Sequence, residues 1–278
     1  MLSQEFMRNA LLAGTFVALA CGVCGWFVVL RGQVFAGDAL SHVAFPGALA
    51  AAAAGLDERV GLFAATVAVA LGMGALGRGA VAFGGGGRRA GSLPVDDTAI
   101  GVLFTFILGL GLFFLTRFSM GSGGSAGVQA AHTLFGSIFG LAAGEARLAA
   151  AVGLAVVLAM AVIARPLLFA SVAPDVAGAR GVPTRLLGIA FLALLGVVAA
   201  EATQAVGALL LLGLLAVPAA AAHRLARGPV AGVALAALFA VAATWAGLAL
   251  AYAVPSLPPS TAIIAIAVAM YSISTILT

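Results

Sequence analysis

Lysine is absent from this chain of 278 residues, and charged residues of both signs make up only 8% of it. A phosphate-binding loop of the Walker type needs a lysine, whereas the glycine run at 84–87 is followed by Arg88 and Arg89. The chain therefore carries no ATPase site of that type, and we predict that it is not an enzyme. Basic patches with interleaved aromatic residues are also missing, so we predict no nucleic-acid partner.

Cysteine is nearly absent as well. The two cysteines, Cys21 and Cys24, lie three residues apart within one apolar run. That spacing on a single helix suits neither a disulfide nor a complete zinc site. We expect both side chains to pack as small residues between helices.

Long apolar runs dominate what the chain does contain. Hydrophobic residues make up 64% of it and the mean hydropathy is +1.23, whereas soluble domains carry about 25% charged residues. We predict an all-α, polytopic protein of the lipid bilayer, forming a single transmembrane domain over 1–278 with about nine transmembrane helices. The predicted spans are 9–30, 34–55, 60–77, 98–116, 147–169, 185–200, 203–222, 229–252 and 260–277. One further segment, 128–143, is short for a crossing and is predicted to be a re-entrant or interfacial helix.

The arginines predict how these helices are oriented, because cytoplasmic loops accumulate positive charge. With the N-terminus outside and the C-terminus inside, nine arginines fall on the cytoplasmic side and four on the outer side. The nine are Arg31, Arg78, Arg88, Arg89, Arg165, Arg180, Arg185, Arg224 and Arg227, and the four are Arg8, Arg59, Arg117 and Arg147. This N-out, C-in topology requires that 128–143 does not cross the membrane.

The segment GDALSHVAFPG at 37–47 places charge inside an apolar run. Asp38 and His42 are four residues apart and share one helix face, about 12 Å into the bilayer if the helix enters near Val34. A charged residue at this depth is costly and by default marks function. Pro46 removes the hydrogen bond to the carbonyl of His42 and predicts a kink there. Carboxylate, imidazole and a freed carbonyl together suit a divalent metal ion. A buried Asp–His hydrogen bond that only holds helices together is the alternative.

Other polar residues give weaker signals. Glu201 is predicted at the turn between 185–200 and 203–222, near the outer surface, where its carboxylate could collect cations or simply be solvated. His132 would be a further metal contact if 128–143 dips into the path. Pro218 predicts a second helix kink.

Two hydrophilic stretches lie on the predicted cytoplasmic side. The first, 77–97, is rich in glycine and is predicted to be a flexible linker. The second, 171–184, contains Pro174 and Asp175, which can open a short helix, and Gly181 and Pro183, which can close it. A compact helix between two membrane spans predicts a contact with another protein.

The order of these features resembles the permease subunits of bacterial ABC importers for zinc, manganese and iron, the ABC-3 family. The matching motifs are GDALSHVAFPG at 37–47, DDTAIGVLF at 96–104, LFG at 134–136, APDVAGARGVP at 173–183 and VGALLLLGLLAVPAAAA at 206–222.

The resemblance implies a multi-pass permease of the bacterial cytoplasmic (inner) membrane with three kinds of partner: cytoplasmic ABC ATPase subunits, an extracytoplasmic metal-binding protein, and a second permease copy in a homodimer. It also implies a coupling helix against the ATPase, formed by Pro174, Asp175, Val176, Ala177, Ala179, Arg180 and Gly181. The metal would be the transported substrate, and no prosthetic group is expected.

These observations predict alternating access, in which Asp38 and His42 receive a divalent metal on its way through the membrane. Zinc, manganese and iron all remain open, because carboxylate and imidazole accept each of them. Two rival functions also remain. One is a stand-alone secondary transporter, in which Asp38 and His42 relay protons. The other is an ABC permease for siderophores or cobalamin.

Overall fold

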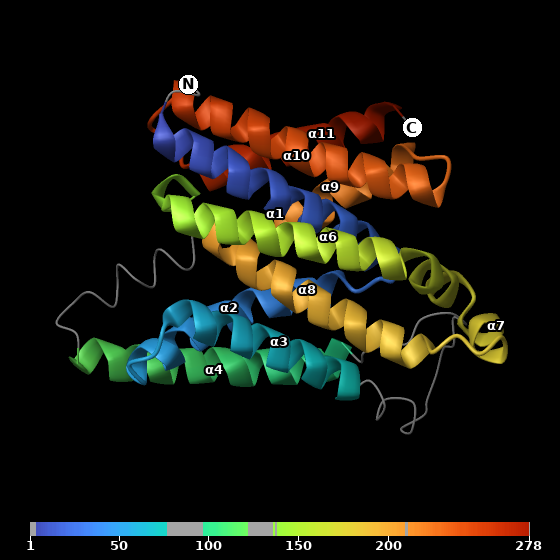
Figure 1. Ribbon diagram of the computed structural model, residues 1–278, viewed down its shortest axis with the longest axis horizontal. Coiled ribbons are helices and arrows are strands. Elements are labelled where there is room, and N and C mark those ends of the chain that lie inside the picture. Colours follow the sequence, from blue (N-terminus) through green and yellow to red (C-terminus); the bar gives the residue numbers. More distant parts are fainter. Residues whose placement is uncertain (1–3, 77–96, 122–135, 137, 209–210, 278) are drawn as a thin grey trace.

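The computed structural model describes the chain except residues 1–3, 77–96, 122–135, 137, 209–210 and 278, and all regular structure in the described part is helical (Figure 1). The α-helices are α1 (Glu5–Leu30), α2 (Val34–Ala53), α3 (Glu58–Leu76), α4 (Asp97–Gly121), α6 (Ala143–Val172), α7 (Pro174–Ala179), α8 (Thr184–Val206), α9 (Leu211–Leu225), α10 (Pro229–Ala253) and α11 (Pro259–Leu277). A single 3₁₀ turn, η1 (Ile138–Gly140), precedes α6. The predicted all-α fold class is confirmed for these residues.

Seven of the described helices are long and apolar enough to cross a membrane: α1, α2, α3, α6, α8, α10 and α11. The apolar stretch Phe104–Thr116 of α4 and the helix α9 are shorter. These nine helices correspond to the nine predicted spans. The main difference is that no turn occurs near Glu201, because α8 continues to Val206. The helix ends at Gly207, which has a φ of +99°. Glycine adopts this backbone conformation readily, whereas other residues are strained in it.

Most of the predicted re-entrant segment, 128–135 and residue 137, lies outside the described residues, so that prediction stays a prediction. Of its remainder, Gly136 has a φ of +70° and η1 packs against α1. A Cβ atom on Gly136 would lie 2.5 Å from the backbone nitrogen of Gly207. Glycine is therefore required at 136 both for its backbone conformation and for its close approach to the end of α8.

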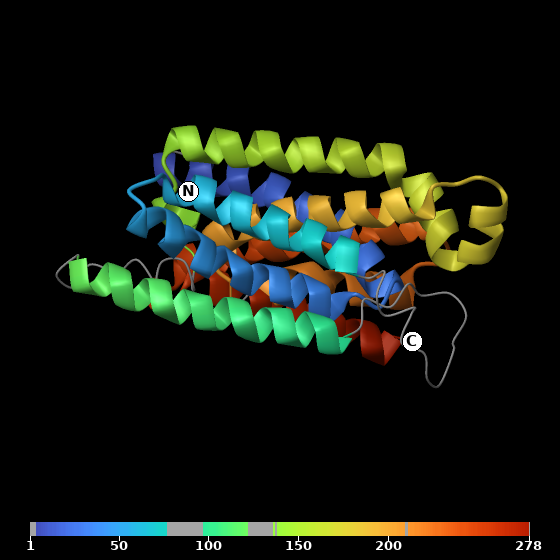
Figure 2. The ribbon, with the colours of Figure 1, turned by 90° about the horizontal axis from the view of Figure 1, so that it is seen from below.

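Helix α1 is central and packs against α6, α8, α9 and α10, while α2 packs against α3, α4 and α8. Figures 1 and 2 show α4 at one edge of the bundle, where α2 separates it from the other helices. Small residues permit close contacts: a Cβ on Gly22 of α1 would lie 2.6 Å from the Cα of Ala237 on α10. Such contacts are typical of helices that associate in lipid, where packing rather than hydrophobic burial drives association.

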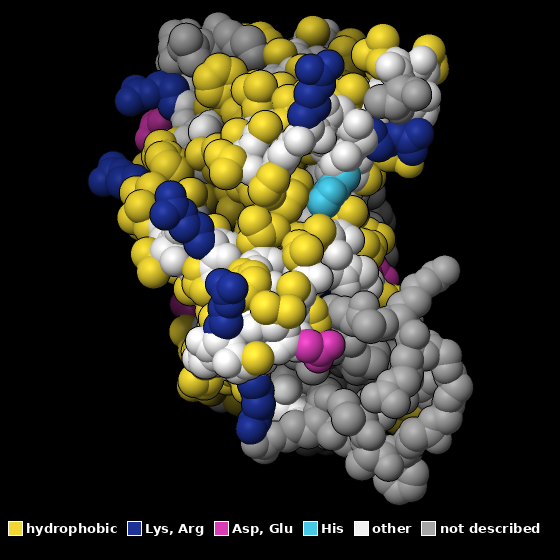
Figure 3. Space-filling model, turned by 90° about the vertical axis from the view of Figure 1, so that its right-hand side faces the viewer, with side chains coloured by type: hydrophobic (Ala, Val, Ile, Leu, Met, Phe, Trp, Pro, Cys, Tyr) yellow, Lys and Arg dark blue, Asp and Glu magenta, His cyan; other side chains and the backbone are white. Residues whose placement is uncertain are grey.

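The two ends of the bundle differ in charge. Figure 3 looks onto the end that carries α7 and shows several arginine side chains there. By helix order, the described arginines at or near that end are Arg31, Arg165, Arg180, Arg185, Arg224 and Arg227, and those near the opposite end are Arg8, Arg59, Arg117 and Arg147. The chain therefore begins at the end with fewer described arginines and finishes at the end with more of them (Figures 1 and 2).

Candidate metal site on α2

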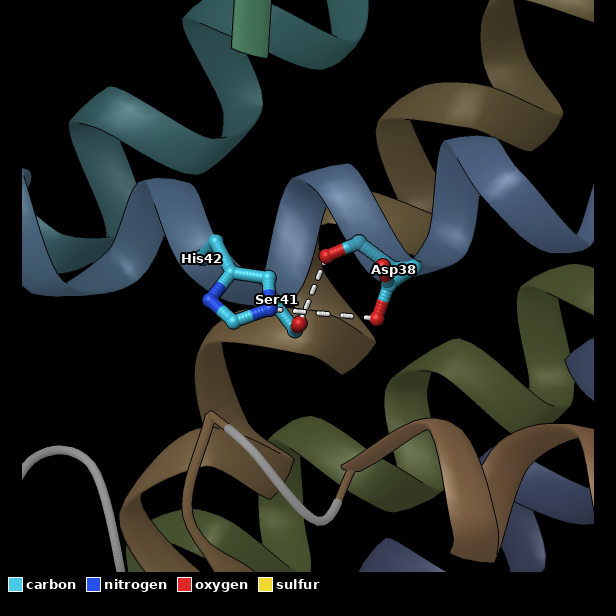
Figure 4. A network of polar contacts seen from close by, with 3 residues as sticks. All are labelled: Asp38, Ser41 and His42. Atoms are coloured by element: carbon cyan, nitrogen blue, oxygen red, sulfur yellow. Dashed lines mark hydrogen bonds and ion pairs between the residues drawn. The ribbon is translucent and has the colours of Figure 1, made fainter. Parts of the chain in front are cut away.

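Asp38 and His42 lie on one face of α2, as their spacing predicts (Figure 4). Nε2 of His42 and Oδ1 of Asp38 are 3.9 Å apart, and the two side chains are 19% and 31% exposed. That separation is longer than a hydrogen bond, so neither group is locked by the other. The hydroxyl of Ser41, between them, donates to the backbone oxygen of Asp38 at 2.6 Å and leaves the carboxylate oxygens free of it.

Neighbouring helices hold this face of α2 in place. The ring of Phe104 on α4 meets the imidazole of His42 edge-on, with centroids 5.3 Å apart. Further along, Gly111 of α4 leaves room for the ring of Pro46, since a Cβ there would lie 2.9 Å from Pro46 Cγ. On the other side of the pair, Gly37 accommodates Leu215 of α9 in the same way, at 2.8 Å. The pair therefore lies on a helix that is packed both before and after it.

The donor atoms of Asp38 and His42 lie slightly farther apart than two ligands of one metal ion. Metal bonds to imidazole nitrogen and carboxylate oxygen are each about 2.1 Å long, so two ligands at the usual angles are about 3.0–3.4 Å apart. The observed 3.9 Å would close to that range with a small rotation of either side chain, since the two are not bonded to each other. Among the described residues no group of three or more His, Cys, Asp or Glu side chains converges on one point. As metal ligands, the two side chains would make only part of a site, which water, backbone oxygen or a second chain would have to complete.

Glu201 does not lie in a solvated turn, which corrects the predicted position. It belongs to the last turns of α8, its side chain is 3% exposed, and Oε1 accepts a hydrogen bond from Nη2 of Arg59 at 2.7 Å. Arg59, near the start of α3, also lies over the ring of Phe63. Because the carboxylate of Glu201 is buried and already paired, this geometry favours a structural role over cation collection.

Sequence reasoning missed this pair, although a signal existed. Glu201 is the last acidic residue of the chain and lies in a long apolar stretch. A carboxylate in such a place needs a cationic partner, and the predicted outer side offered only four arginines. Arg59 is one of them.

The remaining predicted residues divide into described and undescribed ones. His132 lies outside the described residues, so its proposed metal contact stays a prediction. Pro46 and Pro218 lie inside α2 and α9, and both helices continue past them. Cys21 and Cys24 are free and fully buried, in line with a packing role.

The predicted short helix in 171–184 is present as α7, and Gly181 follows it with a φ of +77°. Ala177 is fully buried, and its backbone oxygen accepts from the nitrogen of Val182, which folds the segment back on itself. Of the other residues in the proposed coupling surface, Pro174 is half-buried, whereas Asp175, Val176, Ala179, Arg180 and Gly181 are exposed. An ordered, exposed helix at the arginine-rich end is suited to contact another protein.

A polytopic helical bundle with a carboxylate and an imidazole on one face of α2, and an exposed short helix at one end, has the architecture expected of a membrane transport permease. The ABC 3 transport family model matches residues 3–278, and the chain belongs to that family. This confirms the family that the sequence motifs had indicated.

Similar proteins transport metals according to their names. The manganese transport system membrane protein MntC of Halalkalibacterium halodurans is 32% identical over 89% of this chain and 79% of its own length. A probable iron transport system membrane protein of Haemophilus influenzae is 28% identical over 78% of this chain and 73% of its own length.

Two solved structures share the fold. PsaBC from Streptococcus pneumoniae, in complex with a Fab, matches with a TM-score of 0.80 and 26% identity, covering 98% of this chain and 91% of that chain. An inward-facing putative metal-chelate type ABC transporter matches with a TM-score of 0.65 at 17% identity, covering 98% and 86% of the two chains, and shows likeness of fold alone.

Proposed function

We propose that this chain is the permease subunit of an ATP-driven importer of a divalent metal ion, with manganese as the favoured substrate. The observation that carries the proposal is the open Asp38–His42 pair on α2, 3.9 Å apart and partly exposed in an otherwise apolar segment. The names of the MntC relative and of similar manganese permeases favour manganese over zinc and iron.

The ion would be held only in passing. A carboxylate lowers the barrier that a dication meets in the apolar bundle, and an imidazole adds one neutral donor. Two protein ligands on one helix bind more weakly than the four of a closed structural site. A transit site needs this property, because the ion must leave as well as enter. A second permease copy facing the same path would supply a further Asp38 and His42.

The energy would come from partner subunits. Since the chain has no lysine for a Walker loop, ATP hydrolysis would belong to ATPase subunits docked on the exposed face of α7. The excess of arginine at the end that carries α7 favours a cytoplasmic position for that end. A metal-binding protein would then deliver the ion at the opposite end.

Uptake of radioactive Mn²⁺ by the assembled importer in vesicles tests the proposal. Asp38→Asn and His42→Ala should each lower the initial uptake rate by at least about tenfold, which corresponds to about 1.4 kcal/mol. Ser41→Ala is the matched control, because its hydroxyl is occupied by the backbone of Asp38, and it should keep more than half of the rate. If Asp38→Asn imports Mn²⁺ as fast as the wild type, the pair is not in the path.

A further inference from the structure

Arg31 connects three parts of the bundle at the end that carries α7. Its Nε donates to Oε1 of Gln33 at 3.1 Å, and its Nη1 donates to Oγ of Ser171 at 3.0 Å. Its guanidinium carbon lies 5.5 Å from the ring centre of Phe191 on α8. One side chain therefore contacts the turn before α2, the last residues of α6 and the second turn of α8.

The contact with Gln33 reaches the helix that bears the metal pair. Gln33 is the residue before α2, is only 9% exposed, and its backbone nitrogen donates to the oxygen of Val28 on α1. Its own backbone oxygen accepts from the nitrogen of Gly37. Asp38 follows five residues after Gln33, about 7.5 Å along the helix axis. A displacement at Gln33 therefore moves the first turns of α2 as one body.

The other two contacts reach both helices that flank α7. Ser171 lies three residues before Pro174, and its hydroxyl donates to the oxygen of Leu167 at 2.6 Å, so that its lone pairs are free to accept from Arg31. Phe191 is fully buried on α8, which starts five residues after the end of α7. A rigid movement of α7 would therefore displace Arg31 through both its contact with Ser171 on α6 and its contact with Phe191 on α8.

Only arginine has the geometry for this arrangement. Its planar guanidinium presents donors in a fixed fork and stacks on an aromatic ring, whereas lysine offers a single ammonium on a flexible stem. Gly188 on α8 faces the same guanidinium, since a Cβ there would lie 3.6 Å from Nη2. The guanidinium is therefore held from several sides, whereas an exposed ion pair holds its members only weakly.

We propose that Arg31 is the positioning residue that links α7 to α2, so that movement of α7 driven by the ATPase shifts Asp38 and His42. This inference rests on the proposed function. It assigns to Arg31 a role in coupling, distinct from metal binding and from ATP hydrolysis.

The test measures Mn²⁺ imported per ATP hydrolysed by the complete importer in vesicles, together with the thermal unfolding of each permease. Arg31→Gln should lower the ratio by about fivefold, while ATP hydrolysis stays within about twofold of wild type. Arg31→Lys should give an intermediate ratio, because it keeps the charge without the fork. Ser171→Ala, which removes one of the two hydrogen bonds, should lower the ratio by about twofold.

Arg165→Gln is the matched control, since Arg165 is exposed on α6 near the same end. It should leave the ratio unchanged. The inference is overturned if Arg31→Gln keeps the wild-type ratio, or if uptake and ATP hydrolysis fall in equal proportion with a lower unfolding temperature, which would mark a purely structural clamp. A wild-type importer that moves no Mn²⁺ would refute the proposed function and this inference together, whereas normal wild-type uptake with an unchanged Arg31→Gln ratio would refute this inference alone.

Discussion

The Asp38–His42 pair and the Arg59–Glu201 pair both place ionisable groups inside an apolar bundle, yet their side chains are arranged in opposite ways. In the first, the imidazole nitrogen and the carboxylate oxygen are 3.9 Å apart on a single helix and both groups are partly exposed. In the second, they are 2.7 Å apart, join α3 to α8, and Glu201 is 3% exposed. The donor atoms of the loose pair are not bonded to each other and are available to an ion, whereas those of the tight pair are already engaged.

This difference assigns a structural role to the Arg59–Glu201 pair and a transport role to the Asp38–His42 pair. A buried ion pair gains little net stability over apolar residues, but removing one partner leaves an uncompensated charge. Replacing one member of the Arg59–Glu201 pair should therefore lower the stability of the protein, whereas replacing both members with apolar residues should lower it much less. The Asp38–His42 pair should tolerate loss of a charge in the folded protein, because its members are not bonded to each other.

Breaking the tight pair is the largest expected effect. Glu201→Ala should destabilise the permease by about 1–3 kcal/mol, because the Arg59 guanidinium, whose side chain is 21% exposed, would lose its partner. Chemical denaturation of the purified permease in mixed micelles measures this change. The double variant Arg59→Met with Glu201→Met should recover much of the loss.

Thr203→Val serves as the control on the same helix, since its hydroxyl donates to the backbone oxygen of Ala199 at 2.7 Å within the same helix, and it should cost less than about 1 kcal/mol. Stability unchanged in Glu201→Ala would show that the pair is not structural. Glu201 would then return as a candidate metal contact.

Removing the aromatic ring that packs against His42 should have a smaller effect than breaking the Arg59–Glu201 pair. Phe104→Ala removes the ring that meets His42 edge-on, and we expect Mn²⁺ uptake to fall about threefold, because such a contact contributes about 0.5–1.5 kcal/mol. Phe106→Ala, two residues along α4 and 64% exposed, is the matched control and should leave uptake unchanged. Equal losses in both variants would indicate general damage to α4 rather than a change at His42.

The sequence predicts the helices well because apolar length is a strong signal, and it predicts Asp38 and His42 because four-residue spacing on a helix guarantees a common face. It predicts α7 from a proline and a glycine that open and close a short helix. It misplaces the end of α8, since nothing in an alanine-rich run marks a turn until Gly207. The Arg59–Glu201 and Arg31–Ser171 contacts join residues more than a hundred positions apart, and local patterns do not encode such pairing.

The central claim is that the open pair, and not the tight one, receives the ion. Mn²⁺ bound to the purified permease, at Mn²⁺ concentrations high enough to fill a weak transit site, tests it directly when counted by electron paramagnetic resonance in wild type, Asp38→Asn and Glu201→Gln. We predict that Glu201→Gln binds Mn²⁺ as the wild type does and that Asp38→Asn loses the bound ion. Full binding by Asp38→Asn together with loss in Glu201→Gln would contradict the account.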